Sequence, residues 1–180
     1  MAVDALSRIK GLSIALALAV VTAGSVSVPA RAEIPTRAFV QDTAFERVGC
    51  GMRRLLFSDI YILCLYDGPS SASMLQMDIV YEGDMPDGIP DDWRPHLIEV
   101  ISDETIARIN ASFAQLSTGD IVQFAYLPLA HLSALLVNGE VKVSNPGMEL
   151  YDTVQAMWLG DEPISKRLKK NILGHACDVC

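Results

Sequence analysis

The sequence predicts an α+β fold, in which an antiparallel sheet is covered on one face by helices. Three observations lead to this prediction. Segments rich in aromatic and β-branched residues come early and in the middle of the chain, helical patterns are grouped after them, and Asn138-Gly139 separates two short strand-like runs. A sheet with one helix-covered face has a cleft between its layers, and such clefts favour apolar small molecules.

The first predicted strand is the stretch LLFSDIYILCLYD, which ends at the turn residues Asp67, Gly68 and Pro69. Its length predicts one long strand or a bent pair of strands. The Asn138-Gly139 pair is the strongest short-range signal for a β-hairpin. The predicted strands are therefore 55–67, 75–83, 121–129 and the two arms of a hairpin over 133–144.

Apolar residues recur at helical spacing in four later segments. These are Trp93, Leu97, Val100 and Ile101, then Ile106, Ile109, Phe113 and Leu116, then Leu150, Val154, Met157 and Trp158, and finally Ile164, Leu168 and Ile172. Asn145 and Pro146 are expected to start the third helix. Asp161 is expected to start the fourth helix and Gly174 to end it, with a solvated basic face between them.

The N-terminal segment has the pattern of a secretory signal. Arg8 and Lys10 precede an apolar run without charge over 11–28, and Ala30-Arg31-Ala32 then supplies the small residues that a signal peptidase reads. We therefore expect cleavage after Ala32, export to the periplasm or beyond, a domain over 33–174 and a tail over 175–180. The alternative is an uncleaved membrane anchor, since the run approaches the length of a spanning helix.

The charge of the chain excludes one class of partner. The formal net charge is −8, and it becomes more negative once the predicted leader, with three basic residues and one acidic, is removed. Nucleic acid binding requires basic surface that displaces counterions, so no nucleic acid partner is expected. We also expect no stable membrane insertion after cleavage, no cofactor and no metal.

Three stretches of the sequence resemble the bacterial chalcone isomerase-like family, relatives of plant chalcone isomerase and of plastid fatty-acid-binding proteins. They are GCGMRRLLFSDIYILCLY near the start, STGDIVQFAYLP in the middle, and LLVNGEVKVSNPGMELYDTVQAMWLGDEPISKRLKKNILG at the end. The resemblance covers roughly residues 44–174. It implies an open-faced β-sandwich, a large antiparallel sheet with helices on one face and a ligand cleft between them.

The resemblance also assigns a role to Arg53. In the plant enzyme an arginine after a Gly-x-Gly-x pattern holds the anionic substrate, and the fatty-acid-binding relatives use the equivalent arginine with a tyrosine to hold a carboxylate. Arg53 follows Gly49-Cys50-Gly51-Met52. The plant enzyme has a catalytic threonine in the next strand segment, where this chain has Tyr61, so the chalcone reaction is less well supported than binding.

The chemistry of the side chains agrees with a binding role. A guanidinium offers a planar fork of donors that fits a carboxylate and stays charged at any relevant pH. In an unbroken strand Arg53 and Tyr61 would share a face and Arg54 would point away, whereas a bulge near Ser58-Asp59 would bring Tyr66 in instead. The alternatives for Arg53 are an ion pair with a neighbouring acid such as Glu46 or Asp59, or simple exposure.

The cysteines leave several pairings open. Cys177 and Cys180 form a Cys-x-x-Cys pair, for which a small disulfide loop is expected in an oxidising compartment. Metal binding by this tail with His175 and a thioredoxin-type redox role are less favoured alternatives. Cys50 and Cys64 would pair with each other or with the tail, and Cys64 would alternatively be a packed thiol.

Three functional hypotheses follow from these observations. The first is a periplasmic protein that binds a fatty acid or another amphipathic or aromatic acid without catalysis, with Arg53 at the head group and Tyr61 or Tyr66 beside it. The second is an isomerase, an intramolecular lyase in which Arg53 stabilises developing negative charge and Tyr61 orients the substrate or a water. The third is a structural or partner-recruiting domain that binds no small molecule.

Overall fold

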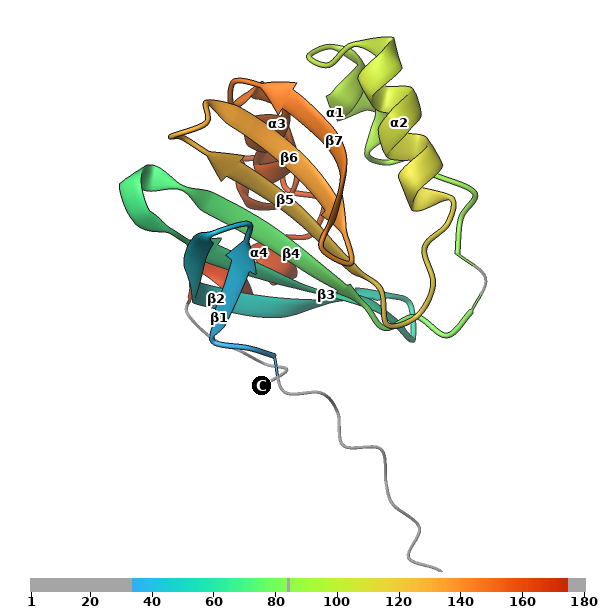
Figure 1. Ribbon diagram of the computed structural model, residues 1–180. Coiled ribbons are helices and arrows are strands. Elements are labelled where there is room, and N and C mark those ends of the chain that lie inside the picture. The colour runs from blue at the N-terminus through green and yellow to red at the C-terminus, as the bar shows by residue number, and fades with distance from the viewer. Residues whose placement is uncertain (1–33, 84, 175–180) are drawn as a thin grey trace, which may run out of the picture. The chain divides into compact units, whose positions relative to one another are not determined.

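The computed structural model describes residues 34–83 and 85–174, and these residues form one antiparallel sheet with helices (Figure 1). Seven strands follow one another in chain order, so each strand pairs with its sequence neighbours. The strands are β1 (Arg37–Val40), β2 (Thr43–Leu55), β3 (Ser58–Asp67), β4 (Ser73–Ile79), β5 (Ile121–Leu127), β6 (Leu132–Val137) and β7 (Glu140–Pro146). The predicted α+β class and the open-faced sheet are confirmed.

The helices lie against one face of this sheet (Figure 1). They are α1 (Arg94–Ile98), α2 (Asp103–Phe113), α3 (Glu149–Leu159) and α4 (Lys166–Leu173), with a short 3-10 turn at Pro69–Ser71. Helix α4 contacts β2 and β3, α3 contacts β5 and β6, and α2 contacts β7. The main core lies between the sheet and these helices, and a second apolar cluster lies on the opposite face.

The Gly-x-Gly pattern lets helix α4 pack closely on strand β2. A Cβ atom at Gly49 would lie 2.1 Å from the backbone oxygen of Ile172, and one at Gly51 would lie 2.8 Å from the side chain of Leu168. Leu168 and Ile172 are the buried residues of α4. The two glycines therefore remove the side chains that would hold the helix away from the strand just before Arg53.

The stretch 55–67, predicted as one long strand or a bent pair of strands, contains the turn and the second strand of a hairpin. Strand β2 ends at Leu55, Leu56 and Phe57 form a two-residue turn, and β3 begins at Ser58. Leu56 has a φ of 55°, a left-handed conformation that non-glycine residues seldom adopt. The alternative of a bent pair of strands was therefore right, although the bend is a complete reversal of the chain.

Three other boundaries differ from the prediction. Asn145 and Pro146 belong to β7, and α3 begins three residues later, at Glu149. The last helix begins at Lys166 because the Ser165 side chain, and not Asp161, accepts a hydrogen bond from the backbone of that helix. Val100 is half-exposed, because α1 ends at Ile98 and the helical spacing no longer applies at that position.

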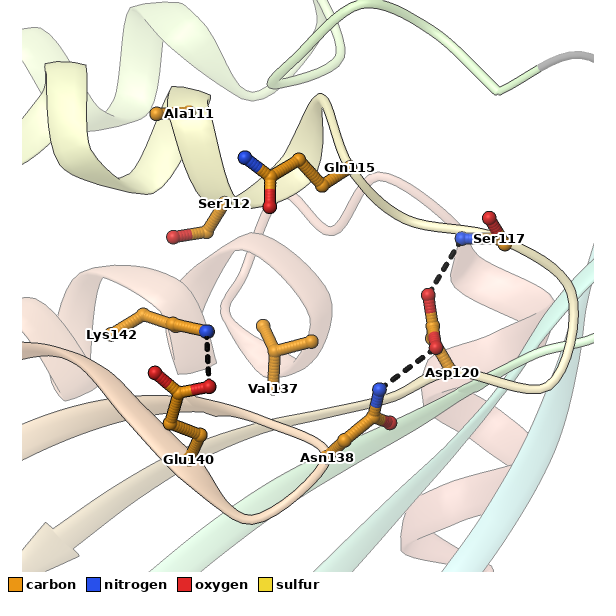
Figure 2. Close-up of a pocket in the computed structure, with 9 residues that line it drawn as sticks. All are labelled: Ala111, Ser112, Gln115, Ser117, Asp120, Val137, Asn138, Glu140 and Lys142. Carbon is orange, nitrogen blue, oxygen red and sulfur yellow. Dashed lines mark hydrogen bonds and ion pairs between the residues drawn. The ribbon is translucent and has the colours of Figure 1, made fainter.

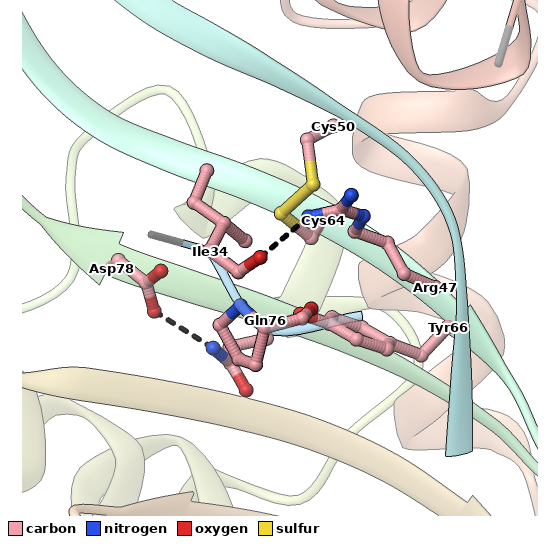
Figure 3. Close-up of a disulfide and its surroundings, with 8 residues drawn as sticks. Ile34, Arg47, Cys50, Cys64, Tyr66, Gln76 and Asp78 are labelled. Atoms are coloured by element: carbon pink, nitrogen blue, oxygen red, sulfur yellow. Dashed lines mark hydrogen bonds between the residues drawn. A yellow bond between two sulfur atoms is a disulfide. The ribbon is translucent and has the colours of Figure 1, made fainter. Parts of the chain in front are cut away.

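A disulfide between Cys50 and Cys64 joins β2 and β3 on the face opposite the helices (Figure 3). The two residues are directly paired in the sheet register and are fully buried. This observation selects one of the pairings that the sequence left open. The predicted Cys177–Cys180 disulfide and the tail lie outside the described residues, as does the predicted signal peptide. Among the described residues, no helix is long and apolar enough to span a membrane.

Candidate binding site

Arg53 lies near the end of β2, directly opposite Tyr61 of β3. A bulge at Ile60 shifts the register between this pair and the next one, Arg54 with Asp59. The side chains of Arg53 and Tyr61 therefore share the face that carries the helices, as the sequence predicted. They meet across two strands of a hairpin, however, and not along one unbroken strand.

Tyr61 is held by the indole of Trp158. The Trp158 Nε1–H donates a hydrogen bond of 2.9 Å to the Tyr61 hydroxyl, and the two rings are nearly perpendicular with centroids 6.5 Å apart. Burial raises the pKa of Tyr61 to about 12, although the Trp158 hydrogen bond and the nearby Arg53 charge lower it. The phenol is therefore neutral at physiological pH, and a phenol that accepts one hydrogen bond still has its own O–H to donate.

Aromatic rings continue from Trp158 into an apolar cavity. Trp93 packs edge-on against Trp158 and against Phe113, with centroid distances of 4.8 and 5.2 Å. The cavity, of about 70 Å³, lies between the sheet and the segment before α1. Its lining is Ile60, Tyr61, Met77, Ile79, Tyr81, Met85, Pro86, Gly88, Pro90, Trp93, Phe113 and Leu116. Tyr61 thus forms part of the wall of an almost entirely apolar space, while its hydroxyl bonds Trp158.

Helix α2 holds the segment that covers this cavity. The Asn110 side-chain oxygen accepts a hydrogen bond of 3.0 Å from the backbone nitrogen of Ile89. Gly88 has a φ of 144°, and a Cβ atom there would lie 2.3 Å from that same Asn110 oxygen. The glycine therefore permits both the backbone conformation and the close approach that this hydrogen bond requires.

The neighbouring acids are paired with other arginines. Asp59 accepts a bond of 2.6 Å from Arg54, and Glu46 accepts one of 3.0 Å from Arg37. Both pairs are exposed, so they contribute little to stability. The half-buried Arg53 instead lies beside Tyr61, whose pKa it lowers. The predicted ion-pair alternatives for Arg53 are therefore not those that the structure forms.

The structure does not bring Tyr66 to this site. Tyr61 and Tyr66 are five positions apart on a stretch of β3 that pairs with β4 without interruption, so they point to opposite faces. Tyr66 is buried in the second apolar cluster and donates a hydrogen bond of 3.0 Å to the Pro35 carbonyl. Near it, Arg47 donates to the Ile34 carbonyl and Gln76 donates to Asp78 (Figure 3).

A larger hollow, of about 550 Å³, lies between α2 and the β6–β7 hairpin (Figure 2). Its polar side chains bond one another: Lys142 pairs with Glu140 at 2.6 Å, and Asn138 donates to Asp120 at 2.8 Å. Asp120 also accepts from the Ser117 backbone nitrogen, so these bonds fix a turn and a hairpin. Although this hollow is larger, it is open and polar. It therefore lacks the apolar interior beside a half-buried cation that the cavity next to Arg53 and Tyr61 has.

Trp93 and Asn110 are the parts of the site that sequence reasoning missed, since Trp93 was assigned only to a helical pattern. One signal was available, because a buried tryptophan carries an indole N–H that needs a partner and a large ring that lines cavities. Among residues 34–83 and 85–174 there is no cluster of three metal-ligating side chains.

Fold and site together define an open-faced β-sandwich with a cation and a phenol beside an apolar cavity. The chain belongs to the chalcone isomerase-like family, whose family model matches residues 82–174. A solved structure with a similar fold is a fatty-acid binding protein of Arabidopsis thaliana, with a TM-score of 0.56 and 13% identity over 78% of this chain and 90% of the other. At that identity the match shows the fold alone. No curated protein matches the chain.

Proposed function

We propose that this protein binds an amphipathic acid, such as a fatty acid, in the space between the sheet and the helices. The carrying observation is that Arg53 and Tyr61 lie side by side next to the apolar cavity. A guanidinium and a neutral phenol are both donors, so together they match the acceptor oxygens of a carboxylate. The hydrocarbon part would enter the cavity. The fatty-acid binding protein with the same fold supports this choice.

Binding requires the cavity to enlarge. Its volume of about 70 Å³ is far below the roughly 300–1,000 Å³ of typical ligand pockets. The cover contributes Met85, Pro86, Gly88, Pro90 and Trp93, and the hydrogen bond from Ile89 to Asn110 ties it to α2. Displacement of this cover would join the cavity to the outside. Weakening the tether with Asn110→Ala is therefore expected to speed the uptake of an acid.

The test is native mass spectrometry of the chain without residues 1–32, purified without denaturant. A co-purifying acid, or uptake of added palmitate, is the expected result. The chain has two tryptophans, Trp93 and Trp158, and both lie in the site, so a titration with palmitate should also change their fluorescence. Absence of any bound species together with unchanged fluorescence would leave the non-binding structural domain as the better hypothesis.

An isomerase of the intramolecular-lyase type is the second candidate. It is favoured by the protonated state of Tyr61 next to Arg53, because both groups would stabilise an oxyanion that develops as a ring closes. A chalcone substrate should then lose its absorbance faster with the protein than without it. An unchanged rate would remove this substrate class and leave binding without catalysis.

We also propose that the protein functions in the periplasm or another oxidising compartment, after cleavage behind Ala32. The Cys50–Cys64 disulfide supports this proposal, because disulfides persist mainly in exported proteins. Cell fractionation, with the N-terminal sequence of the recovered protein, tests it. Recovery of an uncleaved chain from the cytoplasm with reduced cysteines would contradict it.

A further inference from the structure

The turn between β2 and β3 carries three apolar side chains that point into solvent. The exposed fractions are 58% for Leu55, 89% for Leu56 and 103% for Phe57. We call Leu55, Leu56 and Phe57 the apolar tip. Single exposed apolar residues are common on protein surfaces, but three in succession at the end of a projecting hairpin are a feature that needs an explanation.

The backbone of the apolar tip adds a second anomaly. Two-residue hairpin turns favour Asn-Gly because these residues tolerate a positive φ, and the β6–β7 hairpin of this protein has Asn138-Gly139 with φ values of 52° and 79°. The apolar tip has a leucine with a φ of 55° instead. Gln41 in the β1–β2 turn also has a positive φ, of 51°, but its side chain is polar. The apolar tip combines a left-handed backbone with exposed apolar side chains, and this combination points to a use for those side chains.

We propose that the apolar tip inserts into the interface of a phospholipid bilayer and docks the protein there reversibly. Arg53 and Arg54 directly precede the tip in the sequence, and Arg54 lies two residues from Leu56. At the rise of a β-strand this is about 7 Å. Apolar faces of interfacial elements enter the bilayer by about 5–10 Å, so the guanidinium groups would lie at the level of the lipid phosphates.

The shape of the apolar tip favours a lipid over a protein partner. A projecting turn of three residues offers far less area than the roughly 800 Å² per partner of a stable protein interface. A fluid bilayer, in contrast, closes around a narrow convex element. Because the chain is acidic and Arg54 is already paired with Asp59, we expect the apolar residues to contribute more than attraction to anionic lipid does.

The tip is close to the proposed binding site. Ile60, three residues after Phe57, lines the cavity, and its carbonyl accepts hydrogen bonds from the backbone nitrogens of Val80 and Tyr81 at the start of the covering segment. Docking would therefore place the cavity beside a bilayer. A role in taking acids from the bilayer rests on the proposed function, whereas docking itself does not require any bound acid.

The experiment is flotation of the acid-free protein with two kinds of vesicle. One is pure phosphatidylcholine, and the other is an equal mixture of phosphatidylethanolamine and phosphatidylglycerol. The double variant Leu56→Asn with Phe57→Gly gives the tip the two residues of the β6–β7 turn, which tolerate a positive φ, so it should melt at the same temperature or higher. Burial of one apolar side chain in the bilayer raises the partition coefficient about tenfold, so the partition coefficient of the double variant should be at least tenfold lower than that of the wild type.

A matched control is Leu129→Asn. Leu129 is 92% exposed in the β5–β6 turn, which the strand order places at the opposite end of the sheet, and its substitution should leave partitioning unchanged. The single variant Phe57→Ser tests the tip if the double variant is unstable. Failure of the wild type to float with either vesicle, or equal flotation of wild type and tip variants, would overturn the proposal. Since neither arm contains an acid, these results are separable from failure of acid binding.

Discussion

Tyr61→Phe removes one oxygen atom from the site and leaves the shape of the ring unchanged. The Trp158 indole N–H, 2.9 Å from that oxygen and fully buried, then loses its acceptor. A buried donor left without a partner costs about 1–3 kcal/mol. For an m-value of roughly 1–3 kcal/mol per molar urea, the unfolding midpoint should fall by roughly 1 M. Urea titration followed by tryptophan fluorescence measures this shift.

Tyr66→Phe is the matched control for this prediction. Its hydroxyl donates to the carbonyl of Pro35, which is an exposed residue, so water can take the place of the lost donor and the expected loss is only about 0.5–1.5 kcal/mol. Tyr61→Phe should also weaken palmitate binding, whereas Tyr66→Phe should not. A loss of stability for Tyr61→Phe no larger than that for Tyr66→Phe would refute the assignment of Tyr61 as the partner of a buried indole.

Three further predictions concern stability. Burial raises the pKa of Tyr61 from 10.0 to about 12, so between these pH values the folded chain keeps a proton that the unfolded chain releases. The free energy of unfolding should therefore fall as the pH rises through this window, and it should fall less steeply in Tyr61→Phe. Replacement of Cys50 and Cys64 by alanine should lower the free energy of unfolding by about 3 kcal/mol, measured in urea, and reductant should then lower the unfolding midpoint of the wild type far more than that of the variant. Gly49→Ala should displace α4 and lower the melting temperature by several degrees, whereas alanine at the exposed Ser58 should not.

The sequence was informative wherever one local signal dominated. Asn138-Gly139 predicted its hairpin, and the spacing of Ile106, Ile109 and Phe113 predicted α2, because each signal depends on a few neighbouring residues. The turn at Leu56 and Phe57 could not be predicted, since apolar residues there read as strand. The approach of Trp93 to Trp158 depends on how distant elements pack, which no local pattern contains.

The positions of the site residues also depend on how separate strands pair, which no local pattern contains. Arg53 and Tyr61 were expected on one face through an unbroken strand, and they share that face because β2 and β3 pair in a register that a bulge adjusts. The position of Tyr66 follows from simple alternation along β3, once the bulge is known to precede Tyr61. Register between strands, more than the identity of any residue, was the missing information.

Palmitate titration of Arg53→Met beside Arg54→Met tests the central claim most directly. The two arginines are adjacent in the sequence, but only Arg53 lies next to Tyr61, whereas Arg54 pairs with Asp59 at the exposed edge. Hydrogen bonds to charged groups contribute about 1.5–3 kcal/mol, so Arg53→Met should weaken binding by roughly tenfold to a hundredfold and Arg54→Met should not. Equal affinities for Arg53→Met and the wild type would contradict the account.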